Sequence, residues 1–509
     1  MFLWCDTLVW AHRPPRPRPI PPTTPGKPGE TVDPPPGTIG PEMSTTVDTM
    51  DAITVLDAGP APDAGACLRL LAQAELGCWF DRRAIGGISL LMVDPDRVLR
   101  SARAIWPTLT APAAAPPGPF GFAGGWAGWI SYEGALTALG LAPHGAGTAP
   151  DAAVARYAAA LAIDHTRGTA HAVGRGPAGH AAAHAWLRRL ERLGRTAPPT
   201  APARAPRVVD PGPELATFVR QVRQVQRWIA AGETYVANLT YRIRLEGLAD
   251  PPAAYARLAA AHPAPYAALL HDGDRWVLSS SPELLLQRRG ALARTRPIKG
   301  TRGVREVGGP EGLGATPRQA EAPLRARAGS PADRVPGWAP EMRAGSPLAA
   351  DPKERAELTM IVDMERNDLG QVARTGSVRV TELFAVERHP GLEHLLATVE
   401  AEAPAAAGDL LRAMLPGGSV TGAPKRRAVE LLGALEASPR GVYTGTAGYC
   451  DDGGDMEWNV AIRTLEAFGG GCLYGTGGGI TADSDPEREY AETRLKARGP
   501  LRALGVPWE

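Results

Sequence analysis

The sequence predicts an α+β protein with mainly antiparallel sheets. Short apolar runs occur in pairs around turn dipeptides, as at 266–270 and 276–279 around Asp272-Gly273, which is the pattern of β-hairpins. Segments with helical periodicity lie between these hairpins and do not alternate with single strands. With 509 residues, of which 44% are apolar and 21% charged, the chain is long enough to bury a large core.

The composition excludes several classes of protein. The 55 lysines and arginines nearly balance the 54 aspartates and glutamates, so the net charge of +1 gives no reason to expect a nucleic acid or a membrane surface as partner. The five cysteines are scattered, without the spacing of a disulfide scaffold or a zinc site. Because no run of 18 apolar residues is present, we expect a cytoplasmic protein without a transmembrane helix.

The sequence divides into three parts. Residues 1–50 hold a run of proline and arginine that cannot pack a core, and they are predicted to be a disordered tail without a secretory signal. Residues 51–200 form the N-terminal part of the fold, and residues 201–509 form the region that carries the chemistry. In the N-terminal part we expect strands at 88–93 and 153–164, close backbone contacts in the glycine- and aromatic-rich segment 120–132, a helix at 176–193 and a linker at 196–213.

The C-terminal region has firmer patterns. Apolar residues recur at i, i+4, i+7 and i+11 from Phe218, which predicts a helix that ends at Gly232. Residues 303–350 have no period and many Gly, Pro and Ala residues, and are predicted to be a disordered insertion. The other expected elements are a hairpin of 283–287 with 292–295, an alternating strand at 456–466, a short strand at 472–474, and helices at 353–369, 423–435 and 485–504.

Lysine is rare in this chain. Only Lys27, Lys299, Lys353, Lys425 and Lys496 occur, and the other fifty basic residues are arginine. A lysine that is kept in such a chain can mark a place where arginine cannot serve, because only lysine can lose its proton and act as a nucleophile. Chance retention is the alternative for each of them.

Two glycine-rich segments each precede a helix. Three consecutive glycines, Gly477, Gly478 and Gly479, come shortly before the last helix, and Thr421 lies in the segment 416–425 before the preceding one. We interpret both as turns whose N–H groups could bind an anion, with ordinary turns as the alternative. Neither has the pattern of a P-loop or of a dinucleotide-binding turn.

Acidic residues point to a metal or to acid–base chemistry. Glu489, Glu492 and Lys496 share one face of the last helix, and Glu357 lies on the apolar flank of an earlier helix. Carboxylates that approach from two helices suit Mg²⁺, although a salt bridge to arginine is the alternative. Glu283 could be a general acid if it is half buried.

The order of these segments resembles the chorismate-utilising enzymes. The segments are 232–240, Ser281-Pro-Glu283, 296–301, 360–369, 416–425, Ile462-Arg-Thr464, 477–479 and 489–493. This family comprises component I of anthranilate synthase and of aminodeoxychorismate synthase, and the isochorismate and salicylate synthases. The resemblance covers about 215–500 densely and implies a single interleaved body of two large antiparallel sheets with outer helices.

Within this family the sequence is most similar to aminodeoxychorismate synthase component I, because Lys299 stands in Pro-Ile-Lys-Gly-Thr where anthranilate synthases typically have alanine. The resemblance implies that the Lys299 amine attacks C2 of chorismate while the 4-hydroxyl leaves with a proton from Glu283. Ammonia then attacks C4 and expels the lysine, giving 4-amino-4-deoxychorismate for p-aminobenzoate, folate or secondary metabolism. Since the amine must be neutral, we expect burial to depress its pKa.

The resemblance also implies the remaining site residues. Mg²⁺ would be bound by Glu357 and Glu492, with Glu489 nearby, and the ammonia would come from a separate glutamine amidotransferase subunit. Val236 stands where isochorismate-forming relatives have a lysine base, which argues against water as the nucleophile. The expected substrate-binding residues are Thr421, Tyr443, Arg463, Gly477, Gly478, Gly479, Lys496 and His394. Anthranilate synthase component I and a non-catalytic chorismate-binding relative are the alternatives.

Overall fold

The computed structural model describes residues 51–111, 113, 115–143, 150–193, 205–303, 346–389 and 392–508. The predicted tail 1–50 and residues 304–345 of the predicted insertion lie outside these described residues. The last residues of that insertion form helix α7 (Pro347–Ala350), which begins where the Ser346 hydroxyl accepts a hydrogen bond from the Leu348 N–H. Part of the predicted linker forms strand β9 (Arg207–Asp210).

The first sheet contains 12 strands in the described part of the chain, and all of its pairs are antiparallel. In spatial order its strands are β1 (Ile53–Pro60), β8 (Thr169–Arg175), β7 (Ala159–Asp164), β3 (Ile88–Val93), β2 (Leu76–Asp81), β11 (Tyr266–Asp272), β12 (Arg275–Ser281), β21 (Thr464–Phe468), β22 (Gly471–Ile480), β10 (Val236–Glu246) and β18 (Gly422–Ala423), with β9 paired to β10. Strand β2 pairs with β11, so the N-terminal and C-terminal parts of the chain share this sheet.

The second sheet contains ten described strands and is also antiparallel throughout. Its order is β15 (Ile298–Gly303), β17 (Leu392–Glu402), β14 (Leu292–Arg296), β13 (Leu284–Arg289), β20 (Met456–Asn459), β19 (Thr446–Asp451), β5 (Gly125–Ile130), β6 (Ala152–Tyr157) and β4 (Arg97–Leu99), with β16 (Arg379–His389) paired to β17. Trp129 of β5 lies opposite Ala447 of β19, so this sheet too joins distant parts of the chain. The expected interleaved α+β body is confirmed.

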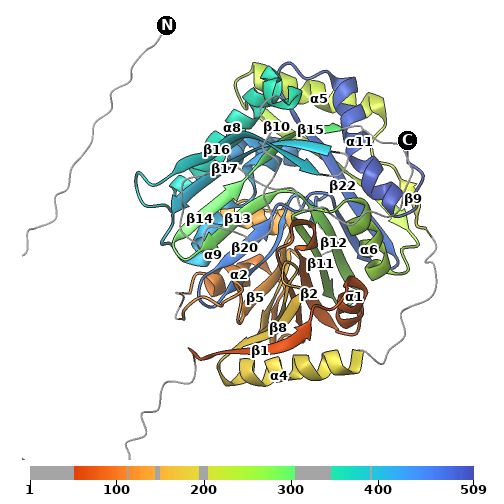
Figure 1. Ribbon diagram of the computed structural model, residues 1–509. Coiled ribbons are helices and arrows are strands. Elements are labelled where there is room, and N and C mark those ends of the chain that lie inside the picture. The colour runs from red at the N-terminus through yellow and green to blue at the C-terminus, as the bar shows by residue number, and fades with distance from the viewer. Residues whose placement is uncertain are drawn as a thin grey trace, which may run out of the picture. The chain divides into compact units, whose positions relative to one another are not determined.

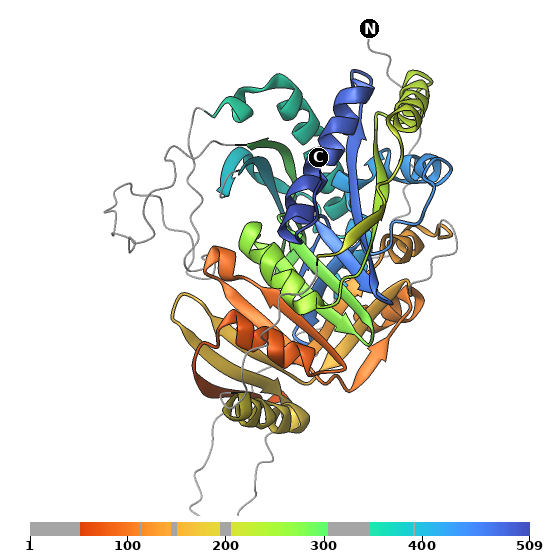
Figure 2. The ribbon, with the colours of Figure 1, turned by 90° about the vertical axis from the view of Figure 1, so that its right-hand side faces the viewer.

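Apolar side chains explain how the two sheets and the helices pack. One core cluster joins Phe80 of the first sheet to Trp129 of the second, and two more lie between the sheets and the helices that cover their outer faces. The first sheet is covered by α1 (Ala64–Ala72), α4 (Gly176–Leu193), α5 (Leu215–Ala230), α6 (Pro251–Ala261) and α11 (Pro486–Ala503), and the second by α2 (Ala102–Leu109), α8 (Pro352–Gly370) and α9 (Ala407–Met414). Figure 1 shows α4 along β1 and β8, and Figure 2 shows α11 beside β22. No described helix is long and apolar enough to cross a membrane.

Most sequence-predicted elements are confirmed, but two predicted strands were wrong in the same way. The apolar run 153–164 forms β6 in the second sheet and β7 in the first. The alternating run 456–466 likewise forms β20 in the second sheet and β21 in the first. Both faces of β20 are buried, so alternation of apolar and polar residues along the chain did not reveal where it crosses from one sheet to the other.

The predicted glycine-rich turn before the last helix was also wrong. Gly477, Gly478 and Gly479 lie in β22, opposite Thr240, Leu239 and Asn238 of β10. In the other glycine-rich segment a short 3-10 turn, Gly418–Val420, precedes β18, and helix α10 (Lys425–Gly433) starts two residues later than predicted. A methyl group at position 475 would lie 2.0 Å from Tyr443 Cγ, so close ring packing, and not a turn, requires glycine there.

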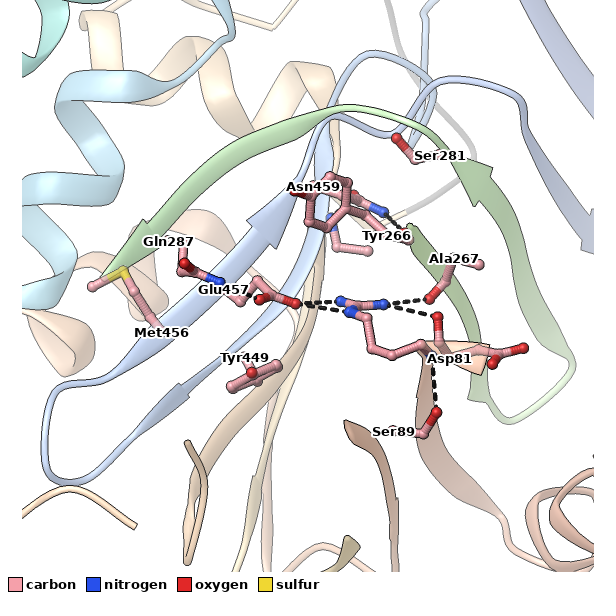
Figure 3. A network of polar contacts seen from close by, with 12 residues as sticks. Asp81, Ser89, Tyr266, Ala267, Ser281, Gln287, Tyr449, Met456, Glu457 and Asn459 are labelled. Atoms are coloured by element: carbon pink, nitrogen blue, oxygen red, sulfur yellow. Dashed lines mark hydrogen bonds and ion pairs between the residues drawn. The ribbon is translucent and has the colours of Figure 1, made fainter. Parts of the chain in front are cut away.

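A polar network ties the sheets together through Arg82, and Figure 3 shows its partners Glu457 and Ala267. The Arg82 guanidinium donates to Glu457 Oε1 at 2.9 and 2.5 Å and to the carbonyl oxygens of Asp81 and Ala267. The Gln287 amide donates to the other Glu457 oxygen at 2.7 Å. Although burial opposes charge, Arg82 lowers the pKa of Glu457 below its usual value, so this pair stays ionised inside the protein.

Candidate active site

Lys299 lies where the edge of the second sheet meets β22 of the first. It is carried by β15, and its Nζ lies 2.8 Å from Glu357 Oε2 on α8. A methyl group at position 479 would lie 3.2 Å from this Nζ, so the absence of a side chain at Gly479 leaves room for the amine. The Lys299 side chain is 24% exposed, which keeps the amine within reach of a small molecule.

The surroundings of Lys299 raise its pKa. Burial lowers the pKa of the ammonium group, but the carboxylates of Glu357, Glu492 and Glu354 raise it, and the net result lies above the usual value for lysine. The expected depressed pKa was therefore wrong, because the acidic side chains around the amine outweigh its burial.

The predicted metal-binding carboxylates lie on α8 and α11 and are joined by lysines. Lys353 Nζ lies 3.8 Å from Glu357 Oε1 and 3.9 Å from Glu489 Oε1, which places these carboxylates on two sides of one ammonium group. Lys496 Nζ lies 2.8 Å from Glu492 Oε1 and donates to the Gly477 carbonyl oxygen at 3.1 Å. These contacts confirm that the two helices bring the predicted acidic residues into one region.

The donor set of this region suits a hard divalent cation. Four carboxylates, from Glu354, Glu357, Glu489 and Glu492, surround the ammonium groups of Lys299, Lys353 and Lys496, so negative charge is in excess. Within the described residues, however, no three Asp, Glu, His or Cys side chains converge closely enough to hold a metal ion by themselves. A cation here would therefore need oxygen ligands from a bound anion or from water.

Glu283 is held as a buried carboxylic acid. It follows β12 and is 3% exposed, its N–H donates to Ser281 Oγ at 3.2 Å, and its carbonyl oxygen accepts from the Val460 N–H at 3.0 Å. Burial raises the pKa of Glu283 to about 7, against the lowering influence of Ser419, Lys299 and the backbone of Ile298. Such a group can donate a proton near neutral pH, as a general acid must.

Arg463 and His394 form a second polar group near Lys299. His394 lies on β17, is 1% exposed, and faces the Gly300 carbonyl oxygen through Nδ1 at 3.3 Å. Its Nε2 lies 3.2 Å from a guanidinium nitrogen of Arg463. Arg463 has a φ of 51° between β20 and β21, a conformation that is rare and costly for residues other than glycine. The crossing of the chain between the sheets thus sets the direction of the Arg463 side chain.

Two predicted substrate-binding residues have their side chains engaged within the fold. The Thr421 hydroxyl is buried and donates to the Gly417 carbonyl oxygen at 2.8 Å, which closes the turn before β18. Tyr443 is 6% exposed, and its ring packs against Gly475. Burial raises the pKa of Tyr443 above its usual value, so this phenol stays neutral.

Sequence reasoning missed several charged residues of the site. Lys353 and Glu354 precede Glu357 on α8, and a methyl group at position 300 would lie 2.8 Å from Glu354 Oε2. Glu365 and Asp368 lie further along the same helix and are buried. The rarity of lysine was a usable signal, because four of the five lysines are described and each makes an ion pair with a carboxylate of α8 or α11.

This fold and this site define a chorismate binding enzyme. The model of the chorismate binding enzyme family matches residues 92–502, and the chain belongs to that family. The resemblance seen in the sequence is therefore confirmed, and the match extends into the N-terminal part as far as residue 92.

Individual relatives are similar over long stretches. Aminodeoxychorismate synthase component 1 of Salmonella typhimurium is 36% identical over 357 residues, which cover 70% of each chain. Aminodeoxychorismate synthase of Streptomyces griseus is 37% identical over 411 residues, which cover 76% of this chain but only about half (51%) of the relative. The crystal structure of anthranilate synthase component I from Streptococcus pneumoniae has a TM-score of 0.67 at 25% identity and covers 82% of this chain and 92% of that one.

Proposed function

We propose that this enzyme is component I of an aminodeoxychorismate synthase, which converts chorismate and ammonia to 4-amino-4-deoxychorismate. The observation that carries the proposal is the position of the Lys299 amine, which lies between Glu357 and Gly479 at the meeting of the two sheets. The names of the Salmonella and Streptomyces relatives support the same reaction. The product would serve p-aminobenzoate and folate synthesis or a secondary metabolite.

The proposed reaction has two displacements. The Lys299 ammonium group must first give up a proton, for which the Glu357 carboxylate at 2.8 Å is an acceptor. The neutral amine then forms a bond to C2 of chorismate, the ring double bonds shift, and the 4-hydroxyl leaves as water with the proton of Glu283. Ammonia then forms a bond to C4, the double bonds shift back, and the Lys299 nitrogen leaves C2. The buried, protonated Glu283 is suited to the first step because a hydroxide ion is a poor leaving group.

The two carboxylates of chorismate need cationic partners. Arg463 and Lys496 supply two, and the backbone of β22 is open beside them because Gly478 and Gly479 have no side chains. Mg²⁺ is a proposed cofactor, held by Glu357 and Glu492 with Glu489 nearby, and it would supply positive charge to the other substrate carboxylate.

Ammonia is the proposed nucleophile for the second step. Val236 of β10 lies beside the site, since its Cγ2 would be 3.6 Å from a methyl group at position 479. An apolar side chain at this point provides no base that could activate water. We propose that a separate glutamine amidotransferase subunit supplies the ammonia.

A product assay tests this function. Protein from residue 51 onward is given chorismate, Mg²⁺ and ammonium, and the products are identified by mass spectrometry for the wild type and Lys299→Ala. We expect aminodeoxychorismate from the wild type and almost none from the variant. Anthranilate as the product would instead identify an anthranilate synthase component I, and bound chorismate without turnover would identify a binding protein.

A further inference from the structure

Asn238 of β10 has its side chain on the face of the first sheet that carries the Lys299 amine. It stands directly opposite Gly479 of β22, and residues opposite each other in an antiparallel pair point to the same face. A methyl group at position 479 would lie 3.2 Å from Lys299 Nζ and 3.6 Å from Val236 Cγ2. The Asn238 side chain therefore points toward the space in which the Lys299 amine lies.

The backbone of Asn238 is held on both sides. Its N–H donates to the Thr421 carbonyl oxygen at 2.8 Å, and its own carbonyl oxygen accepts from Arg440 Nη2 at 2.8 Å. Arg440 is 1% exposed and also donates to both carboxylate oxygens of Glu436, at 2.7 and 2.8 Å, and to the Val420 carbonyl oxygen at 2.8 Å. These bonds fix the direction in which the Asn238 side chain leaves the strand, as a binding residue requires.

The amide group of Asn238 is available to a ligand. The residue is half-buried, and its side chain makes no hydrogen bond to the residues that the structure describes. Its neighbours on this face of β10 offer less, because Val236 is apolar and Thr240 Oγ1 donates to Glu436 Oε1 at 2.9 Å. An amide has an acceptor oxygen and a donor nitrogen, so it can bind a small polar molecule that enters beside Lys299.

Asn238 also lies near the acid that is proposed to act at C4 of chorismate. Its partner Thr421 is two residues from Ser419. Against the burial that raises the pKa of Glu283, the Ser419 hydroxyl and the charge of Lys299 lower it, so both groups lie close to this acid. In the proposed reaction Lys299 bonds to C2, and Glu283 protonates the hydroxyl at C4. A side chain of β10 beside both groups is in place to reach the nucleophile that attacks C4.

The chemistry of ammonia suits an amide better than a carboxylate. Ammonia attacks through its lone pair, which the ammonium ion lacks. The carboxylates around Lys299, among them Glu357 and Glu492, stabilise a cation, so they favour ammonium over ammonia. A neutral amide oxygen accepts a hydrogen bond from an ammonia N–H without placing a negative charge beside it, so the nitrogen keeps its lone pair.

We propose that Asn238 binds the ammonia of the second step, its amide oxygen accepting a hydrogen bond from one N–H while the lone pair faces C4. This inference rests on the proposed function and names the residue that holds its second substrate. As the bond from nitrogen to C4 forms, the ring double bonds shift back and the bond between C2 and the Lys299 nitrogen breaks. One proton passes from the new ammonium group to the departing Lys299 nitrogen, so both amines end neutral.

The test divides the reaction at the Lys299 adduct. The full-length wild type and Asn238→Leu are each mixed with chorismate and Mg²⁺ without ammonia, and intact mass measures the adduct on the enzyme. Ammonium is then added at several concentrations, and the decay of the adduct gives the rate constant of the second step. Because one hydrogen bond to the attacking nitrogen is lost, we expect this constant to fall by about 10- to 100-fold, with adduct formation changed by about threefold or less.

Asn367→Leu is the matched control, because Asn367 is an exposed asparagine of α8 and its replacement should leave both steps unchanged. Asn238→Ala serves for the same measurement if the Tm of the leucine variant shows that it does not fold. Equal second-step rate constants in the wild type and the variant would overturn the proposal. A folded variant that forms no adduct would also overturn it, because Asn238 would then act on chorismate. A wild type that forms no adduct would refute the proposed function itself, and this inference with it.

Discussion

Two groups of buried ionisable side chains in this protein have pKa values that are shifted in opposite directions. Between the sheets, Arg82 and Glu457 meet at 2.5 Å, both side chains are 8% exposed, and the pKa of Glu457 lies below its usual value in spite of burial. Under the turn Gly418–Val420, Glu283 and Glu365 are as deeply buried but have no cation of their own, and burial raises both pKa values.

The difference separates a structural charge from a chemical one. Each of the three Arg82 guanidinium nitrogens donates to an oxygen of β2, β11 or β20, so this network holds the sheets in register and has no proton to give. The acids near the turn have too few cations, so they hold protons near neutral pH. Burial alone therefore does not tell whether a carboxyl group holds a proton that it can donate. The number of nearby cations must be considered as well.

The largest expected effect is the loss of kcat when Glu283 is replaced. Glu283→Gln keeps the size of the side chain but has no proton to donate, so kcat should fall by roughly 10²- to 10⁴-fold while chorismate still binds. Steady-state kinetics with chorismate and ammonium measure this. An unchanged kcat would show that the leaving hydroxyl takes its proton from another group.

Replacing Arg82 of the pair between the sheets should lower the stability of the fold. Arg82→Met leaves Glu457 buried without its main partner, so the free energy of unfolding should fall by about 3 kcal/mol, measured by urea denaturation. The double variant Arg82→Met/Glu457→Met removes both charges and should recover much of this loss. If the double variant is as unstable as the single one, the lost packing of Arg82 and not the unpaired charge is responsible.

The pH dependence of the wild type sharpens the contrast. Glu283 can donate a proton only in its protonated form, and its pKa is about 7. Its contribution to kcat is therefore complete at lower pH and is lost as the pH rises through 7. At constant free ammonia, kcat should therefore fall up to about tenfold per unit above pH 7. The control is Glu283→Gln, whose residual activity should lack this limb.

The smallest effect concerns the space beside Lys299. Gly479→Ala places a methyl group 3.2 Å from the Lys299 amine, which must shift by a few tenths of an ångström. Because the end of a lysine side chain is flexible, we expect a loss in kcat of roughly tenfold or less, with an unchanged Tm. A loss as large as that of Glu283→Gln would mean that the backbone of β22 itself contacts the substrate.

The sequence predicted which charged residues lie together better than it predicted the course of the chain. Helix α5 was found from apolar spacing, and the predicted start of the last helix at 485 agrees with α11, which the Asp485 side chain caps by accepting from two backbone N–H groups. The crossing at 158 was missed because the run 153–164 is apolar and buried almost throughout. The crossing at 460–463 was missed because the alternation of 456–466 continues past the end of β20. Lys299, Glu283 and Glu357 were found because their motifs lie in order along the chain.

Glu365 was missed for a different reason. It lies in a helix that is mostly polar in sequence, and its burial depends on contacts with Thr295 and Gly418, which come from distant segments. The high pKa of Lys299 was missed likewise, since it follows from carboxylates that two separate helices bring together. Such effects depend on tertiary contacts that no local pattern records.

The interleaving of the two sheets also affects how this protein is made. Trp129 of β5 pairs with Ala447 of β19, 318 residues later (447 − 129), so a ribosome that adds about 5–20 residues per second exposes β5 for roughly 16–64 s before its partner exists. During this time an apolar strand edge is open to other chains. Yield in the cell should therefore depend on chaperones that cover the nascent N-terminal strands, and slower translation would lengthen the exposure.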